Sequence, residues 1–273
     1  MSDRIAEPPD LSRMPDDAST NWNPNAGLTL FGRKPALEAL TDTSLAIHCL
    51  HLANSNRPAG IIAQISAEAE KRGVPIRYHD RQALSRISKN GRQDQGVALD
   101  VVCPQFRSIT SLLEDPDPPR TLLALDGVTN PQNVGMIIRS AVAAGIGGVI
   151  YPKRGIASLG PLVIKASAGT LFRAPIIRCE TAAGAIADLQ SAGYRVAVLH
   201  AEASTSLFDD RCEQPTVFVL GGETEGISAA LQALADVQLR IPMANGVESL
   251  NVAVTAALVA FHLQSMATQP ALR

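Results

Sequence analysis

Apolar runs of strand length alternate with helical segments over the second half of the chain. One helix is predicted from about Val134 to Ala144, where apolar residues recur with helical spacing. Strands are predicted at 122–125, 148–151, 174–177, 195–199, 217–220 and 237–241. Such alternation is typical of a parallel sheet with helices on both faces. The second half is therefore predicted to be an α/β domain.

The first half carries a shorter pattern of the same kind. A helix is expected from Pro35, since proline is favoured in the first turn. Further helices are predicted at 59–71 and 81–88, and strands at 48–53, 74–78 and 97–102. These segments predict a small α/β domain from Leu28 to Cys103, of roughly the minimum independent size.

Three segments outside these domains differ in composition. Residues 1–27 are acidic and proline-rich without the apolar run of a signal peptide, which predicts a disordered leader. Charge and proline gather again at 114–120, the end of a linker predicted over 104–119. The second domain is then expected to span 120–266. Polar residues interrupt the apolar stretch 252–266, which is too short for a membrane helix, so we expect a soluble cytoplasmic protein.

Charge is distributed unevenly along the chain. The formal net charge of −2 does not indicate nucleic-acid binding, but from Leu28 to Cys103 the basic residues outnumber the acidic ones. A local basic surface of this kind suits phosphate contacts. After Glu248 no charged residue occurs before Arg273, which predicts that the last helix is buried in a core or an interface. The four cysteines are scattered, so neither a metal site nor a disulfide framework is predicted.

Three short segments carry the candidate chemistry. The strand at 217–220 runs into Gly221 and Gly222, which would let the backbone approach a ligand, and Glu223 follows at once. Arg139 is the sole charged residue between Asp126 and Lys153, where a lone guanidinium needs a partner or an anionic ligand unless it reaches the surface. The three segments read Asn133-Val134-Gly135-Met136-Ile137-Ile138-Arg139-Ser140, Gly221-Gly222-Glu223-Thr224-Glu225-Gly226, and Ile241-Pro242-Met243 with Gly246 and Ser249-Leu250-Asn251-Val252.

These segments resemble the three motifs of the SpoU/TrmH family, in the SPOUT superfamily of RNA ribose 2′-O-methyltransferases. The resemblance implies S-adenosyl-L-methionine as cofactor, RNA as substrate, a trefoil-knot domain with a parallel sheet, and a homodimer whose sites borrow from both chains. The first domain resembles the L30e-like RNA-binding domain of RlmB-type members, at Gly32 to Leu40 and at Gln95-Gly96. Asp94 stands where those members have histidine, which puts a substrate role for that position in doubt.

The resemblance also assigns the catalytic residues. Arg139 takes the central role, but a guanidinium does not normally lose its proton. We therefore expect Arg139 to position the substrate phosphate and polarise the hydroxyl, with Glu223 a competing proton acceptor. Asn133, Ser249 and Asn251 would orient the ribose and the arginine; a turn asparagine, a helix cap and a first-turn cap contact explain these three equally well.

The cofactor site follows from the same motifs. By the resemblance, Gly221, Ile241 and Leu250 line the adenosine part of the cofactor, with Met243 and Leu199 as possible neighbours. Without the family resemblance, Ile241 and Leu250 would be interpreted as ordinary core residues.

The resemblance of the first domain to RlmB-type members implies large-subunit (23S) ribosomal RNA as the substrate. Three alternative functions remain. The interpretation as a dinucleotide-binding oxidoreductase is weak. Glycines 145, 147 and 148 come nearest to a GxGxxG motif, but they lie between a helix and a strand, whereas that motif lies between a strand and a helix. A noncatalytic RNA-binding adaptor would not need Arg139, Glu223 and Asn251. A tRNA methyltransferase stays possible, although tRNA-specific members usually lack the first domain.

Overall fold

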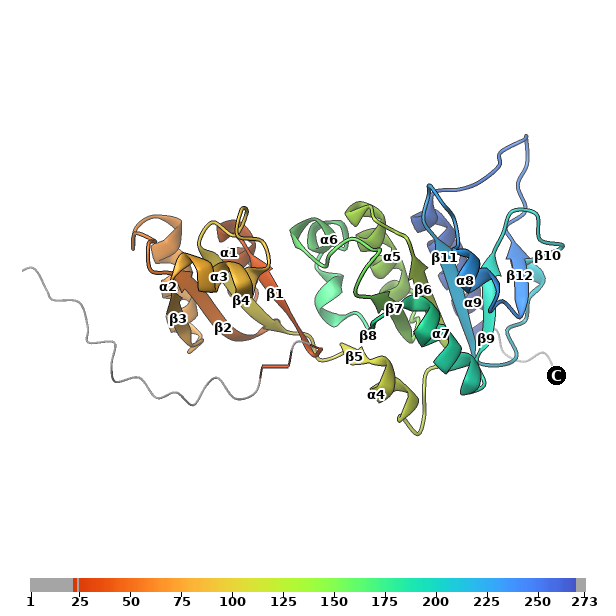
Figure 1. Ribbon diagram of the computed structural model, residues 1–273, viewed down its shortest axis with the longest axis horizontal. Helices are drawn as coiled ribbons and strands as arrows, with labels where there is room; N and C mark the ends of the chain where they lie inside the picture. The colour runs from red at the N-terminus through yellow and green to blue at the C-terminus, as the bar shows by residue number, and fades with distance from the viewer. Residues whose placement is uncertain (1–21, 24, 269–273) are drawn as a thin grey trace, which may run out of the picture.

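The computed structural model describes residues 22–23 and 25–268, and Figure 1 shows two sheets, one in each half of the chain. Apart from residues 22–23 and 25–27, the predicted leader 1–27 lies outside the described residues. Among the described residues, no helix is long and apolar enough to cross a membrane.

The small domain is a four-stranded sheet with three helices. Its sheet has the order β1-β4-β2-β3, in which only β2 and β3 pair in parallel. The elements are β1 (Gly27–Phe31), α1 (Arg33–Thr41), β2 (Ala46–Ala53), α2 (Ile61–Lys71), β3 (Ile76–His79), α3 (Arg81–Ser88) and β4 (Val97–Val102). The sequence pattern did not predict β1, which pairs antiparallel with β4.

The larger domain is built on an eight-stranded sheet, all of whose pairings are parallel. Its order is β10-β12-β9-β11-β6-β7-β8-β5. The strands are β5 (Arg107–Ser108), β6 (Thr121–Asp126), β7 (Gly148–Pro152), β8 (Ile176–Cys179), β9 (Arg195–Leu199), β10 (Thr205–Ser206), β11 (Thr216–Gly221) and β12 (Val237–Arg240). This confirms the predicted α/β class and parallel sheet, while the trefoil knot stays a prediction.

Helices cover both faces of this sheet (Figure 1). Buried side chains of α5 and α9 belong to one hydrophobic core, and those of α7 and α8 belong to another. The helices are α4 (Ile109–Leu113), α5 (Pro131–Ala143), α6 (Pro161–Ala166), α7 (Ala182–Ser191), α8 (Ala229–Gln232) and α9 (Val252–Thr268), with short 3-10 turns η3 (Thr170–Arg173) and η4 (Leu207–Asp209). The predicted linker, 104–119, contains α4 and β5, and β5 pairs with β8 at the edge of the sheet.

Helix α5 begins earlier than predicted. The side chain of Asn130 accepts a hydrogen bond from the backbone N–H of Gln132 at 2.9 Å, and Pro131 occupies the first helical position. An asparagine cap followed by proline favours the start of a helix. The N–H groups of the first turn have no partner within the helix, so a proline loses no helical hydrogen bond there. Asn133 is therefore a buried helical residue, so interpreting it as a turn asparagine was wrong.

Helix α9 is only half buried in the single chain. One face, which includes Ala256, Val259 and Ala260, packs into the core. Val254 and Phe261 lie on the other face and are 48% and 46% exposed. The prediction of a buried helix therefore holds for one face, and the second apolar face remains uncovered.

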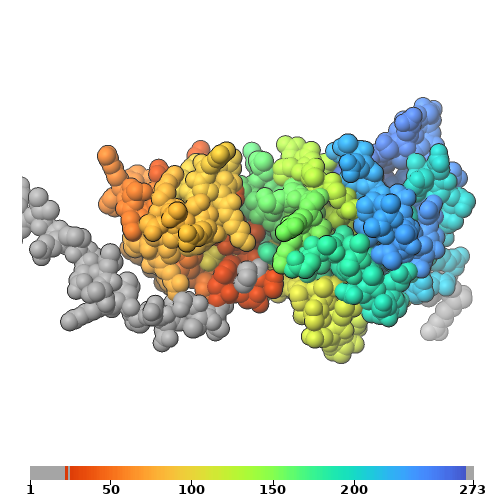
Figure 2. Space-filling view, viewed as in Figure 1, coloured from red at the N-terminus to blue at the C-terminus, as the bar shows by residue number. Residues whose placement is uncertain are grey.

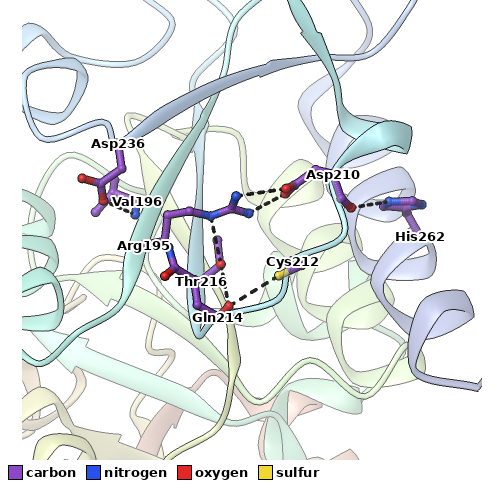
Figure 3. A network of polar contacts seen from close by, with 8 residues as sticks. All are labelled: Arg195, Val196, Asp210, Cys212, Gln214, Thr216, Asp236 and His262. Carbon is purple, nitrogen blue, oxygen red and sulfur yellow. Dashed lines mark hydrogen bonds and ion pairs between the residues drawn. The ribbon is translucent and has the colours of Figure 1, made fainter. Parts of the chain in front are cut away.

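A polar network ties α9 to the amino-terminal side of the sheet (Figure 3). The guanidinium of Arg195, at the start of β9, donates to both carboxylate oxygens of Asp210, with an Nη1–Oδ1 distance of 2.9 Å. Arg195 Nε also donates to the Thr216 hydroxyl at 3.3 Å, and His262 Nε2 lies 3.5 Å from the backbone carbonyl of Asp210. These contacts fix α9 relative to β9 and β11.

Candidate active site

A cavity opens at the carboxyl ends of β9, β11 and β12, where the loops after these parallel strands converge. Its volume is about 260 Å³. In open α/β sheets, ligands bind in a crevice outside the carboxyl ends of the strands. The predicted cofactor residues all line the cavity, namely Gly221, Ile241, Leu250, Met243 and Leu199.

Gly221, the last residue of β11, and Gly222, which follows it, are required by the close approach of the chain's own backbone. A Cβ on Gly221 would lie 2.3 Å from the carbonyl carbon of Gly226, and one on Gly222 would lie 2.3 Å from the carbonyl oxygen of Gly127. Gly222 and Gly226 also form an isolated antiparallel bridge. The expected reason, close approach to a ligand, is therefore incomplete: these glycines let the 221–226 turn fold tightly at the rim of the cavity.

Three side chains from three distant segments meet beside this turn. Asn133 Nδ2 on α5 donates to Glu223 Oε1 at 2.8 Å. Asn251 Nδ2, just before α9, donates to the same oxygen at 2.7 Å and to Asn133 Oδ1 at 3.2 Å. The structure thus joins one residue of each motif in a single hydrogen-bonded network, which we call the amide–carboxylate network.

Asn251 also starts helix α9. Its Oδ1 accepts a hydrogen bond from the backbone N–H of Ala253 at 2.9 Å, as an N-cap side chain does. The oxygen of the Asn251 amide therefore caps α9, while its nitrogen belongs to the amide–carboxylate network. Ser249 is exposed, lines the cavity, and makes no side-chain hydrogen bond within the described part of the chain. Ser249 is thus not the helix cap.

Arg139 lies apart from the network in the single chain. It is exposed, does not line the cavity, and has no hydrogen bond or ion pair with another described residue. It follows Asn133 by six residues, which is about 9 Å along a helix and a different face. Of the alternatives for this lone guanidinium, the single chain shows the one that reaches the surface, because the buried face of α5 points away from it.

The charged side chains that line the cavity are acidic. Glu223 and Glu248 line it, and no lysine or arginine does. Such a site favours a cationic ligand, since nearby carboxylates stabilise positive charge. A sulfonium carries that charge, so the donor set fits the predicted cofactor.

The sequence pattern missed one positioning residue. Asp126, the last residue of β6, accepts a hydrogen bond through Oδ2 from the backbone N–H of Ser228 at 2.7 Å. This contact holds the far end of the 221–228 segment against the neighbouring strand. The sequence signal that could have identified it is an aspartate at the carboxyl end of a buried strand.

Two family models match the chain in sequence. The SpoU rRNA Methylase family model matches residues 120–261, and the model described as RNA 2'-O ribose methyltransferase substrate binding matches residues 29–107. The chain belongs to the SpoU rRNA Methylase family. Membership confirms the predicted enzyme class, an RNA methyltransferase, and with it the predicted cofactor, S-adenosylmethionine.

Relatives of known sequence support this assignment. An uncharacterized tRNA/rRNA methyltransferase of Mycobacterium ulcerans is 33% identical over 233 residues, which cover 85% of this chain and 74% of the relative. The 23S rRNA (guanosine-2'-O-)-methyltransferase RlmB of Xylella fastidiosa is 34% identical over 203 residues, which cover 73% of this chain and 81% of the relative.

Solved structures share the fold. The AdoMet-bound rRNA methyltransferase of Sinorhizobium meliloti has a TM-score of 0.58 at 25% identity, covering 88% of this chain and 87% of that one. The SpoU methyltransferase AviRb of Streptomyces viridochromogenes, in complex with AdoMet, has a TM-score of 0.59 at 22% identity, covering 89% and 91%.

Proposed function

We propose that the protein transfers a methyl group from S-adenosylmethionine to a ribose 2′-hydroxyl of large-subunit (23S) ribosomal RNA. The observation that carries the proposal is the amide–carboxylate network of Asn133, Glu223 and Asn251, placed at the rim of a cavity with carboxylates and no lysine or arginine. A substrate of this kind implies action in the cytoplasm.

The cavity residues divide the work of holding the cofactor. Backbone at Gly221 and the apolar side chains of Ile241 and Leu250 would enclose the adenosine part. Glu223 and Glu248 supply negative charge for its cationic part. When bound, the cofactor supplies an electrophilic methyl group whose transfer requires an in-line approach of the acceptor oxygen.

The chain's polar groups then orient the acceptor. Asn133 and Asn251 hold Glu223 through Oε1, and Oε2 accepts no hydrogen bond from the described residues. This oxygen is placed to accept the hydroxyl proton, whereas Arg139 keeps its own proton and would polarise the hydroxyl beside a phosphate. Ser249 at the cavity rim would contact the ribose.

The position of Arg139 favours a shared site. In one chain it is exposed on α5 and does not line the cavity. The second apolar face of α9, with Val254 and Phe261, is also uncovered, and α9 packs beside α5. We infer that two copies pair through this face, so that Arg139 of one protomer reaches the cavity of the other.

The substrate proposal rests on the two-domain arrangement and on the relatives. The Xylella relative, which spans both domains, is a 23S rRNA enzyme. The Mycobacterium relative is a tRNA/rRNA methyltransferase, so tRNA is the alternative substrate that the experiment has to separate.

The test is incubation of the purified protein with labelled S-adenosylmethionine and unmodified 23S rRNA or tRNA transcripts. We expect a methyl group on 23S rRNA, mapped by its resistance to alkaline cleavage. A methyl group mapped on tRNA alone would identify tRNA, and not 23S rRNA, as the substrate. Cofactor binding without transfer to either transcript would refute the substrate proposal, and absence of cofactor binding would favour a noncatalytic adaptor.

A further inference from the structure

A second and larger cavity lies between the two domains. Its volume is about 560 Å³, and its walls come from β1 and the turn after α3 on one side, and from β8 and the loop between β7 and α6 on the other. Figure 2 shows the orange-to-yellow small domain directly against the green part of the larger domain. We call this cavity the interdomain groove.

The polar lining of the groove is cationic. No aspartate or glutamate is among its lining residues, which is the reverse of the cofactor cavity with its two glutamates. Its charged, amide and small hydroxyl side chains are Lys89, Lys153, Arg154, Arg178, Asn90, Thr29, Ser88 and Ser158. A concave surface with one sign of charge concentrates ligands of the opposite sign, here an anion.

Two of these cations have no partner among the residues that the structure describes. Lys89 and Arg154 are exposed and form no ion pair or hydrogen bond with any described residue. Lys153, by contrast, pairs with Glu180. Lys89 belongs to the small domain and Arg154 to the larger one, so an anion in the groove would be contacted from both domains.

Arg178 lines the groove and is held by contacts with Gly27 and Phe106. One Nη donates to the backbone carbonyl of Gly27 at 2.9 Å, and the guanidinium lies 5.2 Å from the centre of the Phe106 ring. Its Nε is buried and has no hydrogen-bond partner within the described residues. A buried donor without a partner costs free energy, and an anionic oxygen entering the groove would satisfy it.

The groove and the cofactor cavity lie along the same edge of the sheet. Both strands β7 and β11 run in the same direction, so Pro152 at the groove and Gly221 at the cavity mark carboxyl ends of the two strands. Only β6 separates β7 from β11. Two strand spacings amount to about 10 Å, a span that a short RNA segment bridges.

We propose that the interdomain groove binds backbone phosphates of the RNA substrate close to the nucleotide that is methylated. The inference rests on the proposed function, and it assigns substrate contacts to Lys89 and Arg154, with Arg178 as a fixed cation beneath them. Both domains then hold one RNA segment, and the nucleotide beside it reaches the cofactor cavity.

The test compares two double variants of the full chain that lose the same charge. Lys89→Gln with Arg154→Gln removes the free cations of the groove. Lys71→Gln with Arg211→Gln removes one lysine and one arginine that do not line it. Glutamine keeps part of each side-chain stem. The probe is an unmodified 23S rRNA transcript, and affinity is measured over a series of salt concentrations.

Counterion release sets the expected size of the effect. Each lost single-strand phosphate contact lowers the salt slope by about 0.7, which is about fivefold in affinity at 0.1 M salt. The groove variant should therefore bind about 25-fold more weakly with a slope reduced by about 1.4, while S-adenosylmethionine binds as in the wild type. The control variant should change affinity less than threefold.

Equal weakening in the two double variants would overturn the groove proposal. Failure of the proposed function gives a different result. The wild-type protein would then transfer no methyl group to the transcript, regardless of the RNA affinities of the variants. Lys89→Arg and Arg154→Lys, which keep the charge, should restore most of the affinity. Loss of affinity in these two would also contradict phosphate binding.

Discussion

At the scale of single residues, Asn133 shows how the site depends on satisfied polar groups. The residue is 3% exposed and lies in the first turn of α5. Its amide donates to Glu223 and accepts from Asn251. A buried amide is tolerated when its donors and acceptors are paired, so this side chain couples helix α5 to the two other motif segments.

Arg139 should be needed for transfer and not for cofactor binding. Arg139→Ala is expected to lower the rate of methyl transfer about 10²–10³-fold, the usual cost of losing one group that stabilises developing charge. The affinity for S-adenosylmethionine should stay within twofold, because we expect Arg139 to contact the substrate phosphate and the ribose hydroxyl and not the cofactor. Single-turnover assays and calorimetry measure the two effects.

Glu223→Gln supplies the comparison for Arg139. Glutamine keeps an oxygen for the two asparagine donors but cannot accept the hydroxyl proton as a carboxylate does. If Glu223 is the proton acceptor, this variant loses transfer as Arg139→Ala does. Retained transfer in Arg139→Ala would remove the arginine from the mechanism.

His51 should make the small domain less stable at alkaline pH. Burial lowers its pKa, but hydrogen bonds with Asp100 and Cys49 outweigh burial and raise the pKa from 6.5 to about 9. Because the folded pKa is the higher one, the stabilisation is complete below pH 6.5 and is lost as pH rises through about 9. The shift corresponds to about 3 kcal/mol.

The measurement is urea unfolding followed by the fluorescence of Trp22, the only tryptophan of the chain, at pH 6 and at pH 9.5. Trp22 stacks on His48 of β2, so its signal reports on the small domain. In Asp100→Asn the hydrogen-bonded carboxylate is gone, and the loss of stability with pH should be smaller. An equal loss in wild type and variant would refute the role of His51.

At the scale of elements, the close contact of α5 with α6 sets where the motif residues lie. A Cβ on Gly135 would lie 2.5 Å from the Cβ of Ala166 and 2.7 Å from the carbonyl oxygen of Val163. Glycine in a helix interior is normally unfavourable, so the position is determined by packing. The absence of a side chain lets the two helices approach each other.

Gly135→Ala should therefore destabilise the protein although alanine favours helices. We expect a loss of about 1–3 kcal/mol in the free energy of unfolding, as for other overpacked sites. The matched control is Gly184→Ala in α7, whose new Cβ meets only the Thr181 hydroxyl at 3.0 Å. Urea unfolding compares them, and a Gly135→Ala protein as stable as the control would contradict close packing.

At the scale of the whole molecule, the uncovered faces indicate assembly. Val254 and Phe261 on α9 are about half exposed, and Met136 on the neighbouring α5 is 41% exposed. Such apolar side chains on adjoining helices are typical of an interface. Arg139 lies on α5 as well, so assembly and catalysis are predicted to depend on the same surface.

Phe261→Asp should separate the proposed dimer without unfolding the chain. Its side chain is 46% exposed in the single chain, whereas a charge in an apolar interface costs about 2 kcal/mol or more, about 30-fold in the dimer dissociation constant. Tyr78→Asp, an exposed aromatic in the small domain, is the control. Sedimentation and transfer assays decide, and a monomer with full activity would refute the shared site.

The sequence by itself determined the period of each element and the chemistry of the motifs. Alternating strands and helices predicted the α/β class, and the pattern located α3 and β9 at their observed bounds, because local spacing is a property of the chain alone. The motif residues predicted the family, which the family models confirm. The short strand β1 was missed, because its pairing with β4 is a contact between distant segments.

Only the tertiary structure decided how these residues meet. The hydrogen bonds of Asn133 with Glu223 and Asn251 join positions about a hundred residues apart, and no local pattern records that distance. The same holds for Arg139, which is exposed because α5 buries its opposite face. Local periodicity specifies which face of an element is apolar, but the packing of whole elements decides which apolar face is covered and which remains for a partner.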